Sequence, residues 1–241
     1  MRKYFITDEG YTLVDADYSQ IELRLLAHMS GDEVLINAYN EAQDIHRLTA
    51  SQVFHVPFEE VTDLQRRNAK AVNFGIVYGI GAFSLAKDIG VSNKEAKAYI
   101  ESYLATFKGV ADFMESTISS AKENGYVTTI FGRRRYLPEL SSSNHMLRAF
   151  GERVARNAPI QGTAADIIKI AMVNVSKRLK AENLNAKLIL QVHDELIIEA
   201  DESCADTAAK LLKEEMQNAA KMKVELTADV NVGKTWYEAK G

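Results

Sequence analysis

Two aspartates far apart in the sequence have side chains that could do metal chemistry. Asp17 ends an apolar run near the start of the chain, and Asp194 lies between two apolar runs near its end. Carboxylates a few ångströms apart repel, so both stay ionised only when cations lie between them. Magnesium suits such a pair because it takes oxygen ligands and needs only one or two carboxylates besides substrate phosphates. The pair therefore predicts a centre for phosphoryl transfer, in which two ions ~3.5–4 Å apart stabilise the attacking and leaving oxygens.

The residues alone leave a plainer alternative open for these carboxylates. A strand-end aspartate and a turn aspartate can have only structural hydrogen bonds. Glu195 directly follows Asp194. Since two neighbours at a sharp turn do not both point fully inward, we expect Glu195 to have a minor role as a ligand.

A cationic and aromatic stripe is the second feature with chemical potential. Thr62 and Gln65 form a capping box that opens a helix running to Tyr78. At 100° per residue the stripe covers about 120° of that helix; its members are Arg66, Lys70, Phe74 and Tyr78. The small and apolar residues of the opposite face should pack inward; they are Ala69, Val72 and Ile76. The stripe predicts a site for a nucleoside triphosphate, with cations for the phosphates and rings for the sugar and base.

Gly75 interrupts the same helix and costs about 1 kcal/mol of helix propensity. Its presence predicts a close approach of another group to that face. The alternative for the stripe as a whole is a solvated charged face with incidental aromatic residues.

Charge is unevenly distributed along the chain. The net charge is −4 over 241 residues, but residues 127–160 contain six arginines against two glutamates. That segment therefore carries +4 and the rest of the chain −8. Because charge is screened beyond about 8–10 Å, a local basic segment can follow a phosphate backbone on an acidic protein. A solvated arginine-rich surface is the alternative for the triplet Arg133–Arg135.

Composition indicates an ordinary globular protein in a reducing setting. Apolar residues make up 46% and charged residues 26% of the chain. No apolar run approaches the roughly 18 residues of a membrane span, and the first residues do not form a secretory signal. Cys204 is the only cysteine, which rules out an internal disulfide. We predict a cytoplasmic protein without a membrane partner.

Strand patterns lie at both ends of the chain and helix patterns fill the middle. Strands are expected at 12–18, 126–130, 134–137, 187–192, 195–200 and 224–232. Helices are expected at 21–29, 32–39, 44–54, 62–78, 92–106, about 109–124, 145–180 and 202–221, with Gly109 as a break and Pro159 as a kink. This segregation predicts an α+β fold, with an antiparallel sheet, helices packed on one face and a large helical insertion.

Three motifs, in this order, resemble those of the family A DNA polymerases, in particular the bacterial DNA polymerase I group. The segment 17–24 reads Asp-Tyr-Ser-Gln-Ile-Glu-Leu-Arg and is similar to the first metal-binding motif of that family. The segment 66–79, with its Arg-Arg-x-x-Lys and Phe-Gly-x-x-Tyr-Gly patterns, is similar to the nucleotide-binding helix. The segment 191–196, Gln-Val-His-Asp-Glu-Leu, is similar to the second carboxylate motif.

The resemblance implies a role for each matching residue. Asp17 and Asp194 would ligate two Mg²⁺ ions (or Mn²⁺), with the Tyr18 carbonyl as a further ligand. Arg66, Lys70 and His46 would hold the triphosphate of a dNTP, and Lys70 would donate a proton to the leaving pyrophosphate.

Further nucleotide roles follow from the same resemblance. Phe74 would pack near the sugar, where a phenylalanine goes with discrimination against dideoxynucleotides, and Tyr78 would lie by the templating position. Glu22 would block a ribose 2′-hydroxyl, with Gln20 nearby.

Four residues resemble the contacts of the family to primer–template DNA near the primer terminus. They are Arg153, Asn157, Gln161 and His193. The first three are spaced i, i+4, i+8, which places them on one helix face. Donors of this kind can read acceptors that all base pairs share in the minor groove. A hydrogen-bonded turn histidine is the alternative for His193.

The resemblance divides the chain into 1–31 and 125–241 as parts of a palm domain and 32–124 as helical fingers. A family member also has a thumb and often exonuclease segments, and we expect these on another part of the gene product or on a separate partner. The leading hypothesis is template-directed DNA synthesis in replication or repair. A DNA- or nucleotide-binding remnant that needs a thumb-bearing partner is the alternative, and a two-metal nuclease is a third reading that leaves the stripe without a task.

Overall fold

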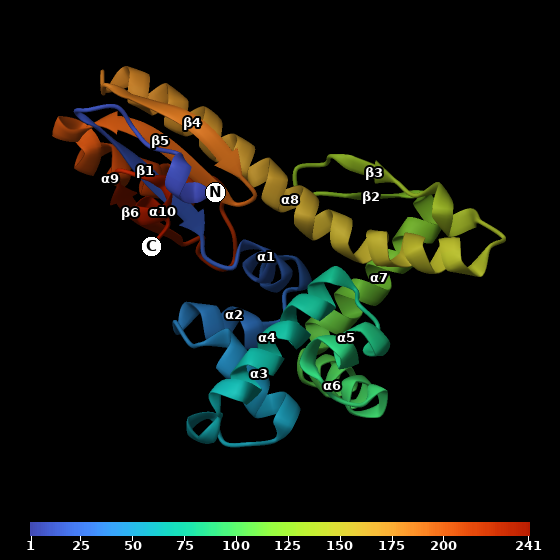
Figure 1. Cartoon of the computed structure of the whole chain (residues 1–241). Helices are drawn as coiled ribbons and strands as arrows, with labels where there is room; N and C mark the ends of the chain where they lie inside the picture. Colours follow the sequence, from blue (N-terminus) through green and yellow to red (C-terminus); the bar gives the residue numbers. More distant parts are fainter. The chain divides into compact units, whose positions relative to one another are not determined.

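The computed structural model describes all 241 residues and has an α+β fold, as predicted (Figure 1). A four-stranded antiparallel sheet has the order β4-β5-β1-β6. Its strands are β1 (Tyr11–Tyr18), β4 (Ala186–Val192), β5 (Glu195–Asp201) and β6 (Ala228–Gly233). A separate two-stranded hairpin consists of β2 (Tyr126–Thr128) and β3 (Arg134–Tyr136).

The helices outnumber the strands. The α-helices are α1 (Ile21–Ser30), α2 (Glu33–Asn40), α3 (Ile45–Phe54), α4 (Asp63–Tyr78), α5 (Ala82–Ile89), α6 (Asn93–Thr106), α7 (Lys108–Asn124), α8 (His145–Ala181), α9 (Ala205–Gln217) and α10 (Trp236–Lys240). Four short 3-10 helices are η1 (Arg2–Tyr4), η2 (Phe58–Glu60), η3 (Pro138–Ser141) and η4 (Glu202–Cys204). None of these helices is long and apolar enough to cross a bilayer.

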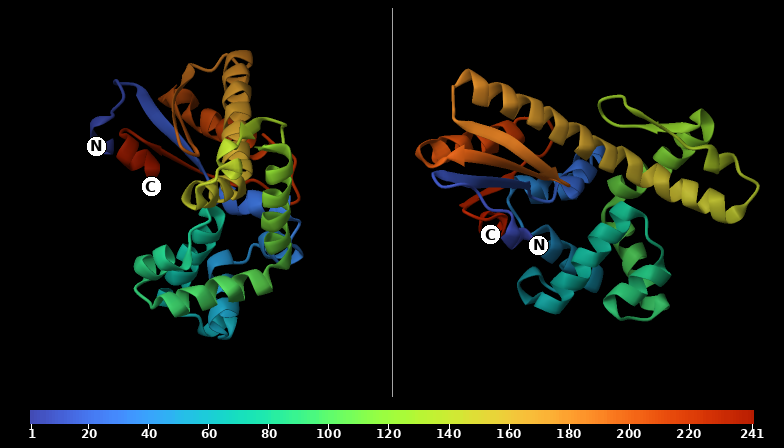
Figure 2. Two further views of the ribbon diagram at one scale, coloured as in Figure 1. Left: turned by 90° about the vertical axis from the view of Figure 1, so that its right-hand side faces the viewer. Right: turned by 45° about the horizontal axis from the view of Figure 1, so that its top comes forward.

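The chain forms two compact units, which we call the sheet unit (1–21 and 164–241) and the helical unit (22–163). The sheet unit contains the four-stranded sheet with α9, α10 and the second half of α8 (Figure 2). The helical unit contains α2 to α7, the β2–β3 hairpin and the first half of α8. Their correspondence to palm and fingers stays a prediction.

Helices cover the two faces of the sheet differently. On β1, alternate residues point to opposite faces, so Leu13 and Asp17 share one face while Ala16 and Tyr18 share the other. Leu13 packs with Ile197 and with Ala239 of α10. On the opposite face the Tyr18 hydroxyl donates to the Met216 carbonyl of α9 at 2.7 Å. The acidic residues of β1 therefore lie on the face that α10 covers.

Helix starts in the helical unit follow the capping signals of the sequence. Thr62 and Ser92 both form complete capping boxes, with Gln65 and Glu95. Such a box satisfies two backbone donors that the first helical turn leaves unpaired. The predicted starts of α4 and α6 are confirmed.

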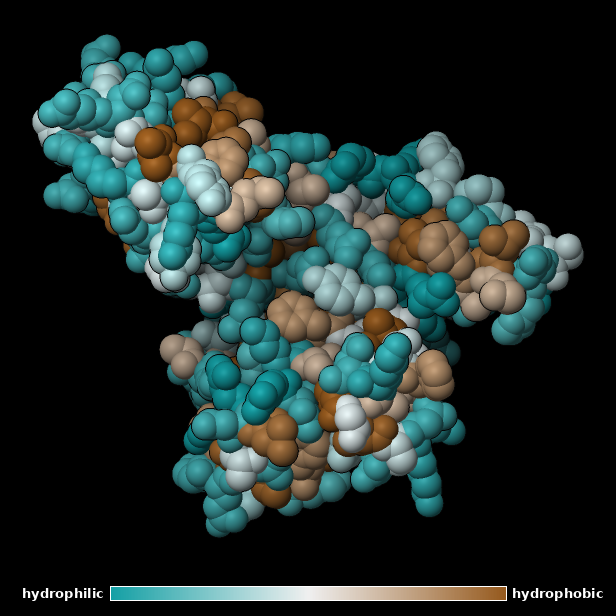
Figure 3. All heavy atoms as spheres, in the orientation of Figure 1, coloured by the Kyte–Doolittle hydropathy of each residue, from teal (hydrophilic) through white to brown (hydrophobic).

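The β2–β3 hairpin packs on α7 and α8 around a small core of its own. The buried residues of this cluster are Ala121, Val127, Leu137, Leu140 and Ala155. Larger apolar side chains stay exposed on the hairpin and at the start of α8, among them Phe131, Met146 and Phe150. The space-filling view shows brown, hydrophobic groups among the teal ones on this face of the molecule (Figure 3).

Several predicted bounds were wrong. The break between α6 and α7 falls at Phe107, and Gly109 lies inside the first turn of α7, where a Cβ would meet the Asp32 Cα at 2.8 Å. The last strand starts at Ala228, four residues later than predicted, and is followed by α10, which was not predicted. A five-residue helix is too short to show a helical period.

Asp32 joins two helices of the helical unit. It is buried, its Oδ1 accepts from the Leu35 backbone N–H at 3.1 Å, and its Oδ2 accepts from the Gly109 backbone N–H at 2.9 Å. The carboxylate therefore caps α2 and ties it to the first turn of α7.

We expect Asp32→Ala to lower the free energy of unfolding by about 2–3 kcal/mol, because it removes a cap and leaves buried donors unpaired. Urea unfolding followed by circular dichroism measures this loss. Asp63→Ala, at an exposed first-turn position of α4, is the matched control and should change the midpoint little. Equal effects of the two substitutions would contradict this role of Asp32.

Candidate active site

The sheet brings the two predicted metal-ligating aspartates together at one edge. Asp17 lies opposite Glu195 in the β1–β5 register, and the Tyr18 backbone N–H donates to the Asp194 carbonyl at 3.1 Å. His193 and Asp194 form the two-residue turn between β4 and β5, and His193 has a positive φ of 55°. The turn thus places Asp194 beside the end of β1 although the two aspartates are far apart in sequence.

A basic residue that sequence analysis missed lies directly on this cluster. The Lys240 Nζ of α10 is 2.8 Å from Asp17 Oδ2 and 2.6 Å from Glu195 Oε2. The Trp236 Nε1–H donates to Glu195 Oε1 at 2.5 Å. Trp236 and Lys240 are spaced i, i+4, which was the available signal that both face the same way.

The crowding of carboxyl groups changes their protonation. Burial, a carboxyl-to-carboxyl hydrogen bond with Glu195 and the negative charge of Glu195 raise the pKa of Asp15 to about 8. Burial and the charge of Asp17 also raise the pKa of Asp194. Burial opposes ionisation of Glu195, but its hydrogen bonds with Asp15, Lys240 and Trp236 keep its pKa below the ordinary value.

Lys240 is the cation of this cluster. Partial burial disfavours its charge, yet its hydrogen bonds to Asp17 and Glu195 raise its pKa above the ordinary value. The cluster thus places a protonated Asp15 and the carboxylate of Glu195 beside the ammonium group of Lys240.

The residues present fit a magnesium site of the kind predicted. Asp17 Oδ1 is buried and has no hydrogen-bond partner, which leaves one carboxylate oxygen for a metal. No group of three or more His, Cys, Asp or Glu side chains has metal-binding geometry. Magnesium does not need one, because one or two carboxylates, water and substrate phosphates complete its shell. Both Glu195 oxygens accept from Trp236 and Lys240, and its ligand role stays a prediction.

The predicted stripe on α4 faces outward, and the opposite face is buried as expected. Lys70 and Tyr78 are exposed and Arg66 and Phe74 half-buried. Ala69 and Val72 are fully buried and Ile76 is 6% exposed. The Phe74 and Tyr78 rings stack at 6.1 Å between centroids, and Lys70 Nζ lies 5.9 Å from the Phe74 centroid.

Asp44, the N-cap of α3, and His46 of that helix lie beside the stripe within the helical unit. Arg66 Nε donates to Asp44 Oδ2 at 2.6 Å, and Asp44 also caps α3 through the His46 and Arg47 backbone N–H groups. The His46 ring lies 6.1 Å from the Phe74 ring. Burial, and then the nearby Lys70 and Arg66, lower the pKa of His46 to about 4 despite the opposing charge of Asp44. His46, Arg66 and Lys70, predicted to act together, thus lie together.

The expected close approach at Gly75 comes from the chain itself. A Cβ there would meet the Ile80 side chain at 2.8 Å, and the Ile80 backbone N–H donates to the Gly75 carbonyl. Gly75 therefore allows the chain to fold back after α4 instead of admitting a ligand.

Of the predicted DNA contacts in the helical unit, Asn157 has a structural task as well. Its Nδ2 donates to the Tyr78 carbonyl at 2.8 Å, while its Oδ1 is buried without a partner. Gly79, which ends α4 with a φ of 63°, lies against Asn157 and Arg153. Arg153 and Gln161 are exposed on the same helix. The first half of α8 thus supports the end of α4.

The remaining predicted residues lie near the boundary of the units or on the hairpin. Gln20 has a φ of 55° just before α1, and Glu22 is in the first turn of that helix. In the arginine triplet, Arg133 Nη2 donates to the Gly162 carbonyl at 2.7 Å and Arg134 lies 4.6 Å from the Tyr126 ring centroid. Arg133 and Arg134 of the basic segment therefore make contacts within the protein.

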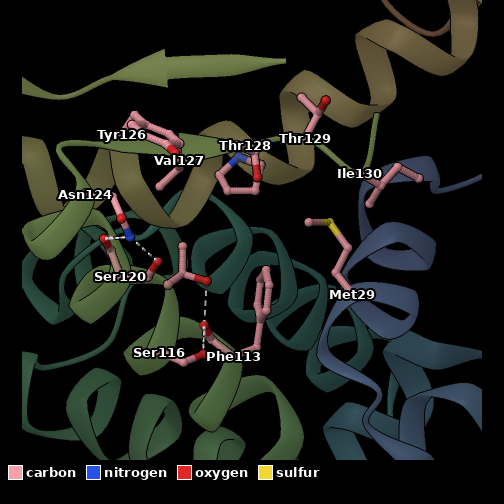
Figure 4. A pocket seen from close by; sticks show the side chains of 12 residues that line it. Met29, Phe113, Ser116, Ser120, Asn124, Tyr126, Val127, Thr128, Thr129 and Ile130 are labelled. Atoms are coloured by element: carbon pink, nitrogen blue, oxygen red, sulfur yellow. Dashed lines mark hydrogen bonds between the residues drawn. The ribbon is translucent and has the colours of Figure 1, made fainter. Parts of the chain in front are cut away.

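A pocket of about 590 Å³ lies between α7 and the hairpin and contains none of the predicted residues (Figure 4). Its polar lining is uncharged; it consists of Ser116, Thr117, Ser120, Asn124, Thr128 and Thr129. Without a cation it does not suit a triphosphate.

Comparison with known proteins identifies the family of the chain. The model of DNA polymerase family A matches residues 1–238, so the chain belongs to this family. DNA polymerase I of Bacillus subtilis is 51% identical over 241 residues, and that of Caldicellulosiruptor bescii is 50% identical over 240 residues. The chain is covered completely in both cases but spans only 27% and 28% of these relatives.

A solved structure gives the same result for the fold. The POL domain of Pol1 from M. smegmatis, in complex with DNA primer-template and dNTP, is 46% identical with a TM-score of 0.94. The match covers 100% of this chain and 42% of that one.

The raised pKa of Asp15 predicts a pH-dependent stability. An unfolded aspartate ionises near pH 4, whereas the folded Asp15 keeps its proton until about pH 8. Folding is therefore favoured at low pH, and this contribution is lost as the pH rises from 4 to 8. Asp15→Asn removes the titration while keeping the shape.

We expect the stability of Asp15→Asn relative to the original chain to rise between pH 5 and pH 8 by at least about 1.4 kcal/mol, the value of one pKa unit, and to level off above. Urea unfolding at a series of pH values measures the difference. Asp206→Asn in the first turn of α9 controls for general charge removal. A difference that does not change with pH would contradict the protonated Asp15.

Proposed function

We propose that this chain carries the catalytic centre of a template-directed DNA polymerase. In the proposed reaction a primer 3′-hydroxyl attacks the α-phosphate of a dNTP and pyrophosphate leaves. The observation that carries the proposal is the placement of Asp17 beside Asp194, with a buried Asp17 oxygen that no donor satisfies. Membership of DNA polymerase family A supports it.

Asp17 and Asp194 would hold two magnesium ions, with the Tyr18 carbonyl as a further ligand. When bound, the ions would supply the charge that stabilises the attacking and leaving oxygens. The task of the protein is to keep the two carboxylates fixed and ionised. Lys240 and Trp236 contribute because they hold Glu195, and Lys240 also holds Asp17.

The residues of α3 and α4 would bind the dNTP. Arg66 is oriented by Asp44, which leaves its remaining donors for phosphate oxygens. Lys70 would bind the triphosphate and donate a proton to the leaving pyrophosphate. Phe74 would pack near the sugar and Tyr78 near the templating position. Glu22 would block a ribose 2′-hydroxyl, with Gln20 nearby.

Primer–template DNA would be held near the primer terminus by Arg153, Asn157, Gln161 and His193. The neighbour from M. smegmatis was solved with primer-template and dNTP, which supports both ligands for this chain. Because the chain spans about a quarter of its relatives, we propose that full activity needs thumb residues from elsewhere in the gene product or from a partner. Primer extension with and without a thumb-bearing segment distinguishes an active chain from a binding remnant.

Asp194→Ala should reduce primer extension by at least about 10²–10³-fold. Asp17 alone would not hold the metal ions whose charge stabilises the attacking and leaving oxygens. Nucleotide affinity should remain within about twofold, since the triphosphate contacts lie in the helical unit. Extension assays and equilibrium binding of a labelled dNTP measure the two effects. Asp201→Ala, at the far end of β5, is the control. Undiminished extension by Asp194→Ala would refute the metal role, and strand shortening by the original chain would indicate a nuclease.

Lys70→Ala should weaken dNTP binding by about 10–100-fold, the value of a charge-assisted hydrogen bond of roughly 1.5–3 kcal/mol. Arg67→Ala is the matched control, because Arg67 is exposed on α4 and lies outside the stripe. Binding of a labelled dNTP distinguishes them. If both substitutions weakened binding equally, general electrostatic attraction would replace the specific contact.

A further inference from the structure

Two buried polar residues, Thr49 and Asn73, are connected to His46 by hydrogen bonds, and packing alone does not explain them. His46, Thr49 and Asn73 are 3%, 0% and 0% exposed. The Thr49 hydroxyl donates to Asn73 Oδ1 at 3.1 Å, and Asn73 Nδ2 lies 3.0 Å from His46 Nδ1. The three side chains form a chain of hydrogen bonds from α3 to α4 and back to α3.

The direction of these hydrogen bonds determines where the imidazole proton lies. A hydroxyl donating to Oδ1 orients the amide so that its NH₂ group faces His46. An amide NH₂ can only donate, and therefore Nδ1 must accept. A neutral imidazole that accepts at Nδ1 carries its proton at Nε2.

We propose that Thr49 and Asn73 are positioning residues that hold His46 as the neutral Nε2–H tautomer, so that His46 meets a triphosphate as an uncharged hydrogen-bond donor. The identity of the ligand rests on the proposed function. The tautomer does not, because it follows from the contacts of the protein alone.

The surroundings of Nε2 suit this role. The only hydrogen bond of the His46 ring within the protein is the one at Nδ1 with Asn73 Nδ2, which leaves Nε2 to a ligand. The charges of Arg66, Lys70 and Asp44 are close enough to act on the His46 pKa. Burial and these cations keep the pKa of His46 low, which agrees with a neutral ring at pH 7.

A neutral donor adds something that a third cation would not. Arg66 and Lys70 supply the charge for the phosphates, while another charge in the same place would raise their mutual repulsion. A fixed N–H instead supplies direction. The opposite amide orientation would place the proton on Nδ1 and turn the Nε2 lone pair toward the phosphate oxygens, where it would repel them.

Long-range ¹H–¹⁵N correlation spectra of the 241-residue chain at pH 7 without nucleotide test the tautomer directly. Assignment uses the loss of signals in His46→Gln. His55, an exposed histidine at the end of α3, is the internal reference for tautomer exchange. We expect an unprotonated Nδ1 and a protonated Nε2 for His46. A proton on Nδ1, an imidazolium or an averaged pattern like that of an exchanging imidazole would overturn the inference.

Variants of the supporting pair separate positioning from general stability. Asn73→Asp is nearly isosteric and as a carboxylate can only accept, so the His46 Nδ1 should become protonated. Thr49→Val removes the hydroxyl that orients the amide and should give a mixture of tautomers, while Thr49→Ser keeps the hydroxyl and the pure pattern. If Asn73→Asp does not fold, the Thr49 pair decides. An unchanged His46 pattern in Thr49→Val would overturn the role of Thr49.

Titration with a magnesium dNTP tests the ligand. The His46 Nε2 signals should shift on binding while the tautomer is retained, and Thr49→Val should weaken affinity about tenfold, whereas Thr49→Ser should stay within about twofold. If the nucleotide binds without shifting the His46 Nε2 signals, the ligand half of this inference is overturned while the proposed nucleotide role of α4 stands. If no nucleotide binds, the proposed role itself fails, while the tautomer stands. The two failures are therefore distinguishable.

Discussion

Repulsion among carboxyl groups at one edge of the sheet is the constraint that the candidate active site has to satisfy. The register of β1 and β5 places Asp17 opposite Glu195, and the turn between β4 and β5 adds Asp194. Such groups cannot all ionise at close range without cations. A proton on Asp15 and the ammonium group of Lys240 reduce this repulsion. The short helix α10 is thus part of the electrostatics of the site.

In the helical unit the repulsion is between cationic side chains instead of carboxylates. Arg66 is paired with Asp44, and the Lys70 Nζ lies 5.9 Å from the Phe74 ring centroid. His46 stays neutral because burial and its cationic neighbours disfavour a further charge. In both units the side chains that would contact substrate have hydrogen-bonding partners in the protein. These partners fix the orientation of the side chains that they contact.

Sequence patterns predicted those parts of the fold that depend on local physics. The capping boxes at Thr62 and Ser92 and the outward stripe on α4 follow from neighbouring residues, and the structure contains them. Lys240 and Asp15 were missed because their importance comes from tertiary contacts: a five-residue helix shows no period, and a buried aspartate within an apolar strand gives no local signal of its proton. The close approach predicted at Gly75 is confirmed, but the helix pattern could not name the approaching group, which is Ile80 of the following turn.

The residues that support the cationic stripe and those that support the carboxylates lie in different units of the chain. Asp44, Thr49 and Asn73 belong to the helical unit, as do the cations and the histidine that they support. Trp236 and Lys240 belong to the sheet unit, as do the carboxylates that they hold. Mutations far apart and without shared partners usually act independently. The two sets of supporting residues share no contact partner, so we expect the proposed triphosphate recognition and the proposed carboxylate chemistry to respond to different substitutions.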